Sequence, residues 1–135
     1  PILNTVNIGN VSASVLNVGS VNQGSDMRFK NFIFPLETKY GLSFINNLKP
    51  VTYNLISNGK NSIGLIAQDV EESLTAAGVS KNKYMMLQHT PNDEEGASQY
   101  GIDYGKLIPV LINAIQEQQE VIETLQTKVK ALEGA

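Results

Sequence analysis

The sequence contains no cysteine and no tryptophan, and its 135 residues include a single histidine, His89. Without cysteine, the chain can form no disulfide, no thiolate nucleophile and no Cys-bound metal site. One histidine does not provide for a His-based zinc site, and a Ser-His-Asp triad is not expected either. The composition therefore predicts a protein that uses no metal and no cofactor.

Charged residues are also scarce, at 17% of the chain against about 25% in a typical globular domain. The formal net charge is -3, which argues against a nucleic acid or an anionic membrane as a partner. No apolar run approaches the roughly 18 residues that span a bilayer. Because the chain begins with Pro1 rather than methionine, we expect it to be a fragment of a longer polypeptide.

Residues 1–24 have no charged side chain and contain an internal repeat. Thr5–Val11 is echoed ten residues later by Val15–Val21, and apolar residues alternate with small polar ones in both copies. Period-two alternation predicts strands with one buried face, which two strands cannot bury alone. We therefore expect the end of a fibrous β-stem whose core is shared between chains, the alternative being a Ser- and Asn-rich linker. The residues that would face this core are Val6, Ile8, Leu16 and Val18.

Residues 25–102 carry mixed charge, aromatics and most turn signals, and they predict a small antiparallel α+β module. An acidic loop, residues 91–96, precedes the last strand. Asn58-Gly59 is a strong signal for a hairpin turn. The expected elements are a helix over 42–48, strands over 51–55 and 63–67, a helix over 68–74 that ends near Gly78, and strands over 84–87 and 100–102.

Residues 103–133 predict a long helix with a heptad seam, in which Glu and Gln fill the outer positions. So narrow an apolar stripe favours a partner helix, although a helix packed on its own domain is the alternative. β-branched residues at a with leucine at d lean toward dimers, but Gln118 adds a polar layer that leaves the number of helices open. The a positions are Ile115, Ile122 and Val129, and the d positions are Leu111, Gln118, Leu125 and Leu132.

Catalytic candidates gather in Ser25–Lys30, directly after the uncharged segment. A lysine can activate a serine when burial or a nearby cation lowers the lysine pKa far below about 10.4, and Arg28 could supply that cation. Spacing alone favours a plainer interpretation, in which Ser25 or Asp26 caps a turn and the basic side chains are solvated. If Ser25 and Lys30 do meet, the backbone must bend between them, because five residues on a helix or a strand separate the two side chains. Otherwise Lys30 comes from another chain.

Four motifs in order resemble the C-terminal intramolecular chaperone domain of phage tailspikes, endosialidases and neck appendages. This is the peptidase S74 family, which is also represented in myelin regulatory factors. The resemblance covers residues 25 to about 125, and the stem before it resembles the end of a viral fibre. Asn31 departs from the family, in which the residue after the lysine is often acidic. The motifs are Ser25-Asp26-x-Arg28-x-Lys30, Leu48–Tyr53, Ile63–Val70 and Ile102–Leu111.

The resemblance implies a homotrimer that templates the folding of the upstream fibre segment of its own chain and then cuts itself off. The cut would fall between Gly24 and Ser25, with Ser25 as nucleophile, Lys30 as base, and Asp26 and Arg28 in support. It also implies a virion tail or appendage precursor that folds in the host cytoplasm and loses this domain after cleavage. The expected organisation is then a β-stem end over 1–24, a chaperone and autoprotease module over 25–102, and a trimeric coiled-coil helix over 103–135.

The chemistry that the resemblance implies is compatible with the residues. The Ser25 hydroxyl lies next to the carbonyl of its own preceding residue, so attack is intramolecular and little translational entropy remains to be lost. Gly24 has no Cβ and can adopt strained backbone geometry. The main alternative is a permanent trimerisation module that keeps the fold and never cuts. A receptor-binding tip based on residues 91–96 is weaker, and a hydrolase for diffusible substrates has least in its favour.

Overall fold

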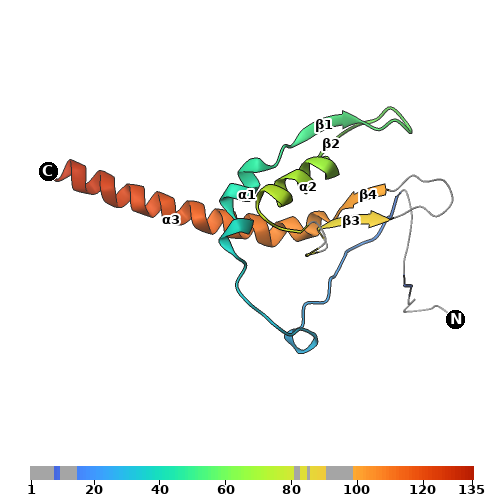
Figure 1. Cartoon of the computed structure of the whole chain (residues 1–135), viewed down its shortest axis with the longest axis horizontal. Coiled ribbons are helices and arrows are strands. Elements are labelled where there is room, and N and C mark those ends of the chain that lie inside the picture. Colours follow the sequence, from blue (N-terminus) through green and yellow to red (C-terminus); the bar gives the residue numbers. More distant parts are fainter. Residues whose placement is uncertain (1–7, 10–14, 81–82, 85, 91–98) are drawn as a thin grey trace. The chain divides into compact units, whose positions relative to one another are not determined.

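The computed structural model describes residues 8–9, 15–80, 83–84, 86–90 and 99–135 (Figure 1). Val6 of the predicted stem and the acidic loop over 91–96 lie outside these residues. The chain divides into two units, Pro1–Phe34 and Pro35–Ala135. Each unit is therefore described by itself.

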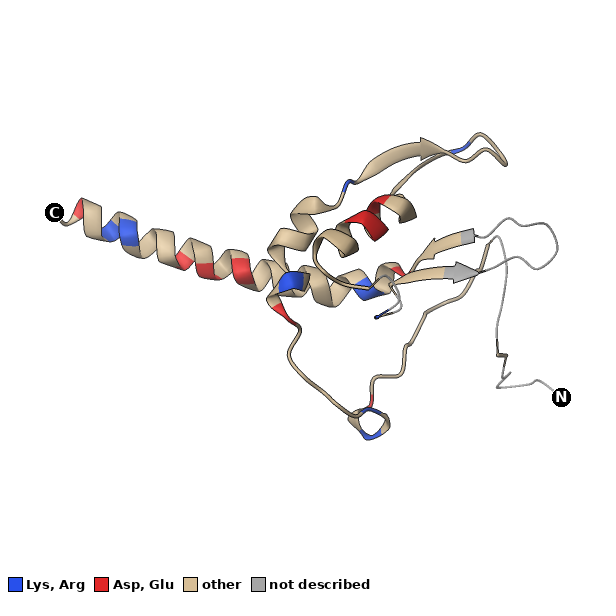
Figure 2. Cartoon of the chain, in the orientation of Figure 1, with Lys and Arg blue, Asp and Glu red and all other residues tan. Residues whose placement is uncertain are grey.

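The first unit contains a single helical turn in its described part, the 3₁₀ turn Met27–Phe29. Residues 15–24 form no strand within the one chain, and their apolar side chains are exposed. No charge precedes Asp26 in the described residues of this unit (Figure 2). A core shared between chains would bury this apolar face, and it stays a prediction.

The second unit is an α+β module with two separate antiparallel hairpins and a long C-terminal helix, which confirms the predicted fold class. One hairpin pairs β1 with β2, and the other pairs β3 with β4. In chain order the elements are α1 (Leu42–Asn47), β1 (Val51–Asn54), β2 (Asn61–Gly64), α2 (Ala67–Ala76), β3 (Leu87–Thr90), β4 (Gln99–Ile102) and α3 (Leu107–Glu133).

The first hairpin turns at Asn58-Gly59, as predicted. Gly59 has a φ of 66°, a conformation that glycine adopts without steric cost, and the Asn58 side chain accepts a hydrogen bond from the Lys60 N–H at 3.0 Å. The expectation of a strand over 63–67 was wrong in its bounds. The pairing of β1 with β2 ends at the Val51–Gly64 pair. Two residues later, the Ile66 carbonyl already accepts a hydrogen bond from the Val70 N–H of α2.

The third strand also lies later than expected, at Leu87–Thr90 rather than 84–87. The position of β3 is set by its partner β4. Leu87 pairs with Ile102, and each later residue of β3 pairs with an earlier residue of β4. Just before this pair, the Asp103 N–H donates to the Met86 carbonyl at 2.8 Å. Met86 and Leu87, the last two residues of the expected strand, are buried in the core.

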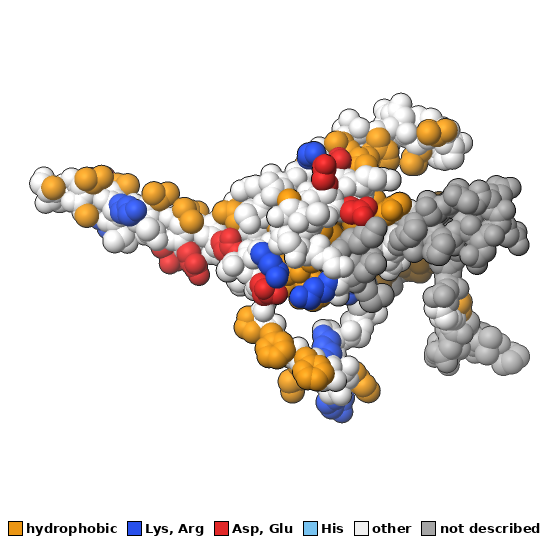
Figure 3. Space-filling view, in the orientation of Figure 1, with side chains coloured by type: hydrophobic (Ala, Val, Ile, Leu, Met, Phe, Trp, Pro, Cys, Tyr) orange, Lys and Arg blue, Asp and Glu red, His pale blue; other side chains and the backbone are white. Residues whose placement is uncertain are grey.

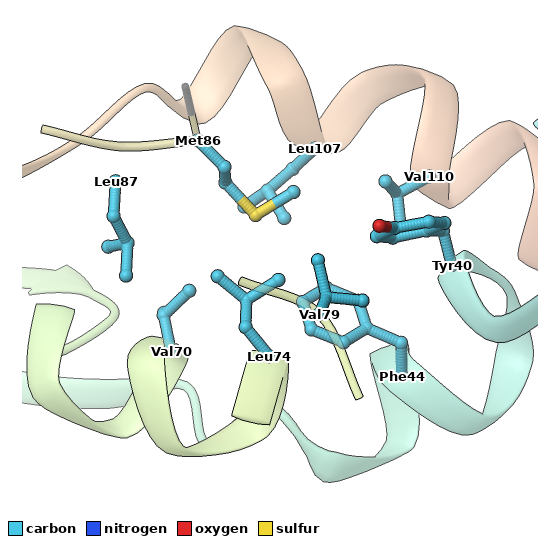
Figure 4. Packing of buried hydrophobic residues seen from close by; sticks show 9 residues of the cluster. All are labelled: Tyr40, Phe44, Val70, Leu74, Val79, Met86, Leu87, Leu107 and Val110. Carbon is cyan, nitrogen blue, oxygen red and sulfur yellow. The ribbon is translucent and has the colours of Figure 1, made fainter. Parts of the chain in front are cut away.

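The core of the second unit lies where α1, α2, β3 and the start of α3 converge (Figure 4). Burying each such side chain contributes about 1.5–3 kcal/mol, which is how elements this short hold together. Ser73 joins two of the helices, since its hydroxyl donates to the Asn47 carbonyl at 3.2 Å and to the Asp69 carbonyl at 2.9 Å. The buried residues are Tyr40, Phe44, Val70, Leu74, Val79, Met86, Leu87, Leu107 and Val110.

Helix α3 begins at Leu107 rather than 103, because Tyr104–Lys106 form a separate 3₁₀ turn. The Asp103 carboxylate caps this turn by accepting the Gly105 N–H at 3.0 Å. The start of α3 packs on its own unit, whereas its C-terminal part extends away from the other elements of the unit (Figure 1). Hydrophobic side chains run along that extended part (Figure 3). The buried residues at the start are Leu107, Val110 and Ala114, and the exposed seam residues are Leu111, Ile115, Ile122, Leu125, Val129 and Leu132.

Candidate functional site

The 3₁₀ turn Met27–Phe29 bends the backbone between Ser25 and Lys30. Asp26 precedes the turn in an extended conformation, and its carbonyl accepts the Phe29 N–H at 3.1 Å. The Lys30 N–H closes the turn on the Met27 carbonyl at 3.0 Å. A bend of this kind is what the five-residue spacing requires if the two side chains of one chain are to meet.

The two side chains do meet. Lys30 Nζ lies 2.6 Å from Ser25 Oγ and donates a hydrogen bond to it. For base catalysis the same contact must run the other way, with the hydroxyl donating to a neutral amine. Both residues are exposed, so no residue in the described part of the chain shields the pair from water.

Asp26 and Arg28 form a second pair in the same turn. The Asp26 carboxylate accepts the Arg28 backbone N–H at 2.9 Å and is bound by the guanidinium, with Nη2 2.6 Å from Oδ2. These hydrogen bonds hold the pKa of Asp26 below its usual value and raise that of Arg28. The pair fixes the turn that carries the Ser25–Lys30 contact. It also balances the charge of Arg28, the residue that could have supplied a cation beside Lys30.

Gly24, the residue before Ser25, is sterically unconstrained among the described residues. A Cβ built at Gly24 would have no heavy atom within 4 Å, and the φ angle of this residue lies outside the left-handed region. The single chain therefore gives no steric reason for glycine here. The role that we predicted for it, access to a strained geometry during attack, concerns the reacting state.

Sequence reasoning did not anticipate that two of the four motifs meet. The Tyr104 hydroxyl accepts a hydrogen bond from the Leu65 N–H at 2.9 Å. A Cβ at Gly64 would lie only 2.7 Å from that hydroxyl, so the glycine leaves the space that the tyrosine tip occupies. A glycine interrupting an otherwise apolar strand was the available signal, because it often marks a close approach.

In the described part of the chain, no three His, Cys, Asp or Glu side chains are grouped so as to hold a metal ion. Among the helices described, none has the length and apolar character needed to cross a bilayer.

Comparison with known proteins agrees with the motif content. Residues 25–79 match the family model of Peptidase_S74, the chaperone of endosialidase. No curated protein matches the sequence. A crystal structure of a novel intramolecular chaperone superposes with a TM-score of 0.56 at 20% identity, covering 71% of this chain and 98% of that chain. At that identity the likeness establishes a shared fold.

The matched region begins at Ser25, the residue whose hydroxyl meets Lys30, and extends to Val79 in the core of the second unit. It thus contains the first three motifs singled out in the sequence. Residues 25–79 of this chain are thus similar to the chaperone-of-endosialidase family, Peptidase_S74.

Proposed function

We propose that this chain is the C-terminal intramolecular chaperone of a viral fibre or appendage. It assembles as a homotrimer, promotes the folding of the fibre segment upstream in its own chain, and releases itself by cutting between Gly24 and Ser25. The observation that carries the proposal is the 2.6 Å contact between Lys30 Nζ and Ser25 Oγ at the first residues of the family match.

The reaction needs no group from outside except water. Lys30 takes the proton of the Ser25 hydroxyl as Oγ attacks the Gly24 carbonyl carbon. The bond between that carbon and the Ser25 nitrogen then breaks, and the nitrogen takes up a proton. This leaves an ester between Gly24 and Ser25 Oγ. Water hydrolyses the ester to a Gly24 carboxylate and a free Ser25 hydroxyl.

The exposure of the pair gives a reason for cleavage to depend on assembly. A lysine serves as a base only when its amine is neutral, which burial or positive neighbours favour. In one chain Lys30 is exposed and Arg28 is paired with Asp26. We therefore infer that surroundings supplied by the folded, assembled fibre complete the site, so that cleavage follows correct folding.

The exposed seam of α3 supports assembly with copies of the chain. Ile122, at an a position, is 48% exposed, and the other apolar seam residues are exposed as well. A largely apolar pocket of about 630 Å³ adjoins the seam, and Leu111 both lines this pocket and occupies the first d position. Helices of neighbouring copies would cover the seam, and the resemblance noted in the sequence implies three copies.

The test is mass spectrometry of the purified wild type and of Ser25→Ala. The wild type should yield a new N-terminus at Ser25, and Ser25→Ala should stay uncut while it assembles normally, because only one small hydroxyl is lost. An uncut wild type would leave the permanent trimerisation module as the better account. Cleavage in Ser25→Ala would remove the enzymatic proposal.

Lys30→Arg tests the role of the lysine more sharply. Arginine keeps the positive charge but cannot give up its proton at accessible pH. If Lys30 is the base, the arginine variant stays uncut. Cleavage of Lys30→Arg at a rate near that of the wild type would contradict the base assignment and leave only an electrostatic role.

A further inference from the structure

Helix α3 holds the segment Glu37–Leu42 by polar contacts that lie off its seam. The Asn113 side-chain amide donates to the Glu37 carbonyl at 3.2 Å and to the Tyr40 carbonyl at 3.4 Å. One turn further along, Glu117 Oε2 accepts the Leu42 N–H at 3.1 Å. Two side chains of the long helix thus bind three backbone groups, those of Glu37, Tyr40 and Leu42, in the segment that leads into α1.

The fit around Glu117 is close. A Cβ at Gly41 would overlap Glu117 Oε1 where it now lies, so the glycine leaves room for this position of the carboxylate. That same oxygen is buried and has no hydrogen-bond partner among the described residues. Burying a polar atom without a partner costs free energy, so fold stability alone does not explain why a carboxylate occupies this position.

We propose that Asn113 and Glu117 form a positioning clamp for the cleavage reaction. Through it, α3 fixes the backbone that follows the Ser25–Lys30 pair and makes cleavage responsive to the state of the helix. The inference rests on the proposed function, because it presupposes cleavage between Gly24 and Ser25. Neither residue touches the reacting atoms, and both act through the backbone that they hold.

Covalent geometry links the clamp to the reacting pair. Glu37 follows Lys30 by seven residues, so the chain spans at most about 25 Å between them. Within this connection Phe32 has a φ of 51°, a left-handed conformation that costs a bulky L-residue on the order of 1–2 kcal/mol. Such strain persists where the chain is held from outside, and an anchored Glu37 is one point from which it is held.

The same helix carries the seam that the proposed trimer would use. Ile115 lies between Asn113 and Glu117 in sequence and is 63% exposed. A change in α3 on assembly therefore reaches the Gly41–Leu42 backbone within one helical turn, through direct hydrogen bonds. This gives the reaction a physical connection to assembly that does not depend on residues 1–24.

The test measures the rate at which the Ser25 N-terminus appears, by mass spectrometry of the full chain. It is run at concentrations where light scattering shows complete assembly, with thermal unfolding recorded in parallel. Five variants are compared with the wild type: Glu117→Ala, Glu117→Gln, Gly41→Ala, the Gly41→Ala/Glu117→Ala double variant, and Asn113→Asp. Glu120→Ala, an exposed glutamate on the same helix, is the matched control.

Glu117→Ala, Gly41→Ala and Asn113→Asp should each slow cleavage by about tenfold or more, since small displacements of a reacting group have effects of this size. Glu117→Gln should restore the rate to within about twofold, because its amide oxygen still accepts the Leu42 N–H. The double variant should cut no more slowly than Glu117→Ala, because the overlap at Gly41 is gone. Glu120→Ala should match the wild type.

Wild-type rates in both Glu117→Ala and Asn113→Asp would overturn the clamp, as would rates that fall only in proportion to lost assembly. If Glu117→Ala fails to fold, Asn113→Asp and the glutamine variant decide the matter by the same criteria. A wild type that never releases Ser25 would instead remove the proposed function, and the clamp with it. The two failures are therefore distinguishable.

Discussion

Phenylalanine side chains are buried in the second unit and exposed in the first: Phe44 is 1% exposed, whereas Phe34 is 77% exposed. A core of buried apolar residues from α1, α2, β3 and α3 forms after Pro35, although the α3 seam stays exposed, whereas every described large apolar residue before Pro35 is exposed in the single chain. Exposed apolar side chains in such number mark surfaces that function buries. The second unit therefore has a core within one chain, and the described residues of the first unit have none.

The strongest test of this contrast is truncation of one phenylalanine in each unit. Phe44→Ala should lower the free energy of unfolding by about 3–5 kcal/mol, because it leaves a cavity in a small core. Phe34→Ala should change it by less than about 0.5 kcal/mol in the single chain. Chemical denaturation of the uncut Ser25→Ala background measures both, and equal losses would break the contrast.

The second test concerns α3, whose apolar residues are buried at its start and exposed along its C-terminal part. Ile122→Asp should abolish assembly, because each chain would bring an unpaired carboxylate into the seam, yet the second unit should stay folded. Thr124→Asp, also exposed but off the seam, is the matched control and should assemble normally. Light scattering and circular dichroism give the two readouts. Normal assembly of Ile122→Asp would show that this seam is not the interface.

A third test uses the pKa of a core tyrosine. Burial raises the pKa of Tyr40 to about 12, so its neutral form is favoured in the folded state. The resulting stability is fully present below the unfolded value of about 10 and is lost as the pH rises through 10 toward 12. Denaturation midpoints should fall more between about pH 9 and about pH 11 in the wild type than in Tyr40→Phe. Parallel curves would contradict this account.

The smallest expected effect belongs to the exposed turn of the first unit. Hydrogen bonds from Arg28 lower the pKa of Asp26 from its usual value of 3.8. The Asp26 carboxylate therefore caps the turn at any pH above 3.8, and the cap is lost only as the pH falls through the lowered pKa. Carboxyl NMR should place the Asp26 pKa below 3.8 in the wild type and nearer to it in Arg28→Ala. An unchanged value in the variant would mean that the ion pair does not persist in solution.

The sequence predicts well those elements whose signals are local. The Leu42, Phe44, Ile45 and Leu48 spacing gives α1 almost to the residue, and Asn58-Gly59 gives the hairpin turn. The predicted bounds of β2 and β3 were displaced because the limits of a strand depend on the strand with which it pairs. The end of β2 is set by its pairing with Val51, and the start of β3 by its pairing with Ile102. Periodicity reports which residues are apolar and does not report which strand they pair with.

The polar contacts of α3 could not be predicted from the sequence, for a similar reason. Glu117 belongs to a run of Glu and Gln that predicts a solvated helix face, and only the arrival of Gly41 and Leu42, more than seventy residues away in sequence, places it inside. For the candidate site, the family resemblance singled out Ser25 and Lys30, and their spacing required a bend between them if the two side chains were to meet. It did not reveal that Asp26 and Arg28 would pair with each other.

The exposure of Ser25 and Lys30 also bears on whether the proposed cut can be undone. Cleavage would create a carboxylate on Gly24 and an ammonium on Ser25, and it would give residues 1–24 their only anionic group. Both new ends would be hydrated once the fibre and its chaperone separate, because Ser25 and Lys30 are exposed in the described part of the single chain. Resealing the peptide bond would require both groups to lose charge and hydration together. The reaction would therefore run in one direction, and a fibre separated from its chaperone would carry a permanent chemical record of having folded.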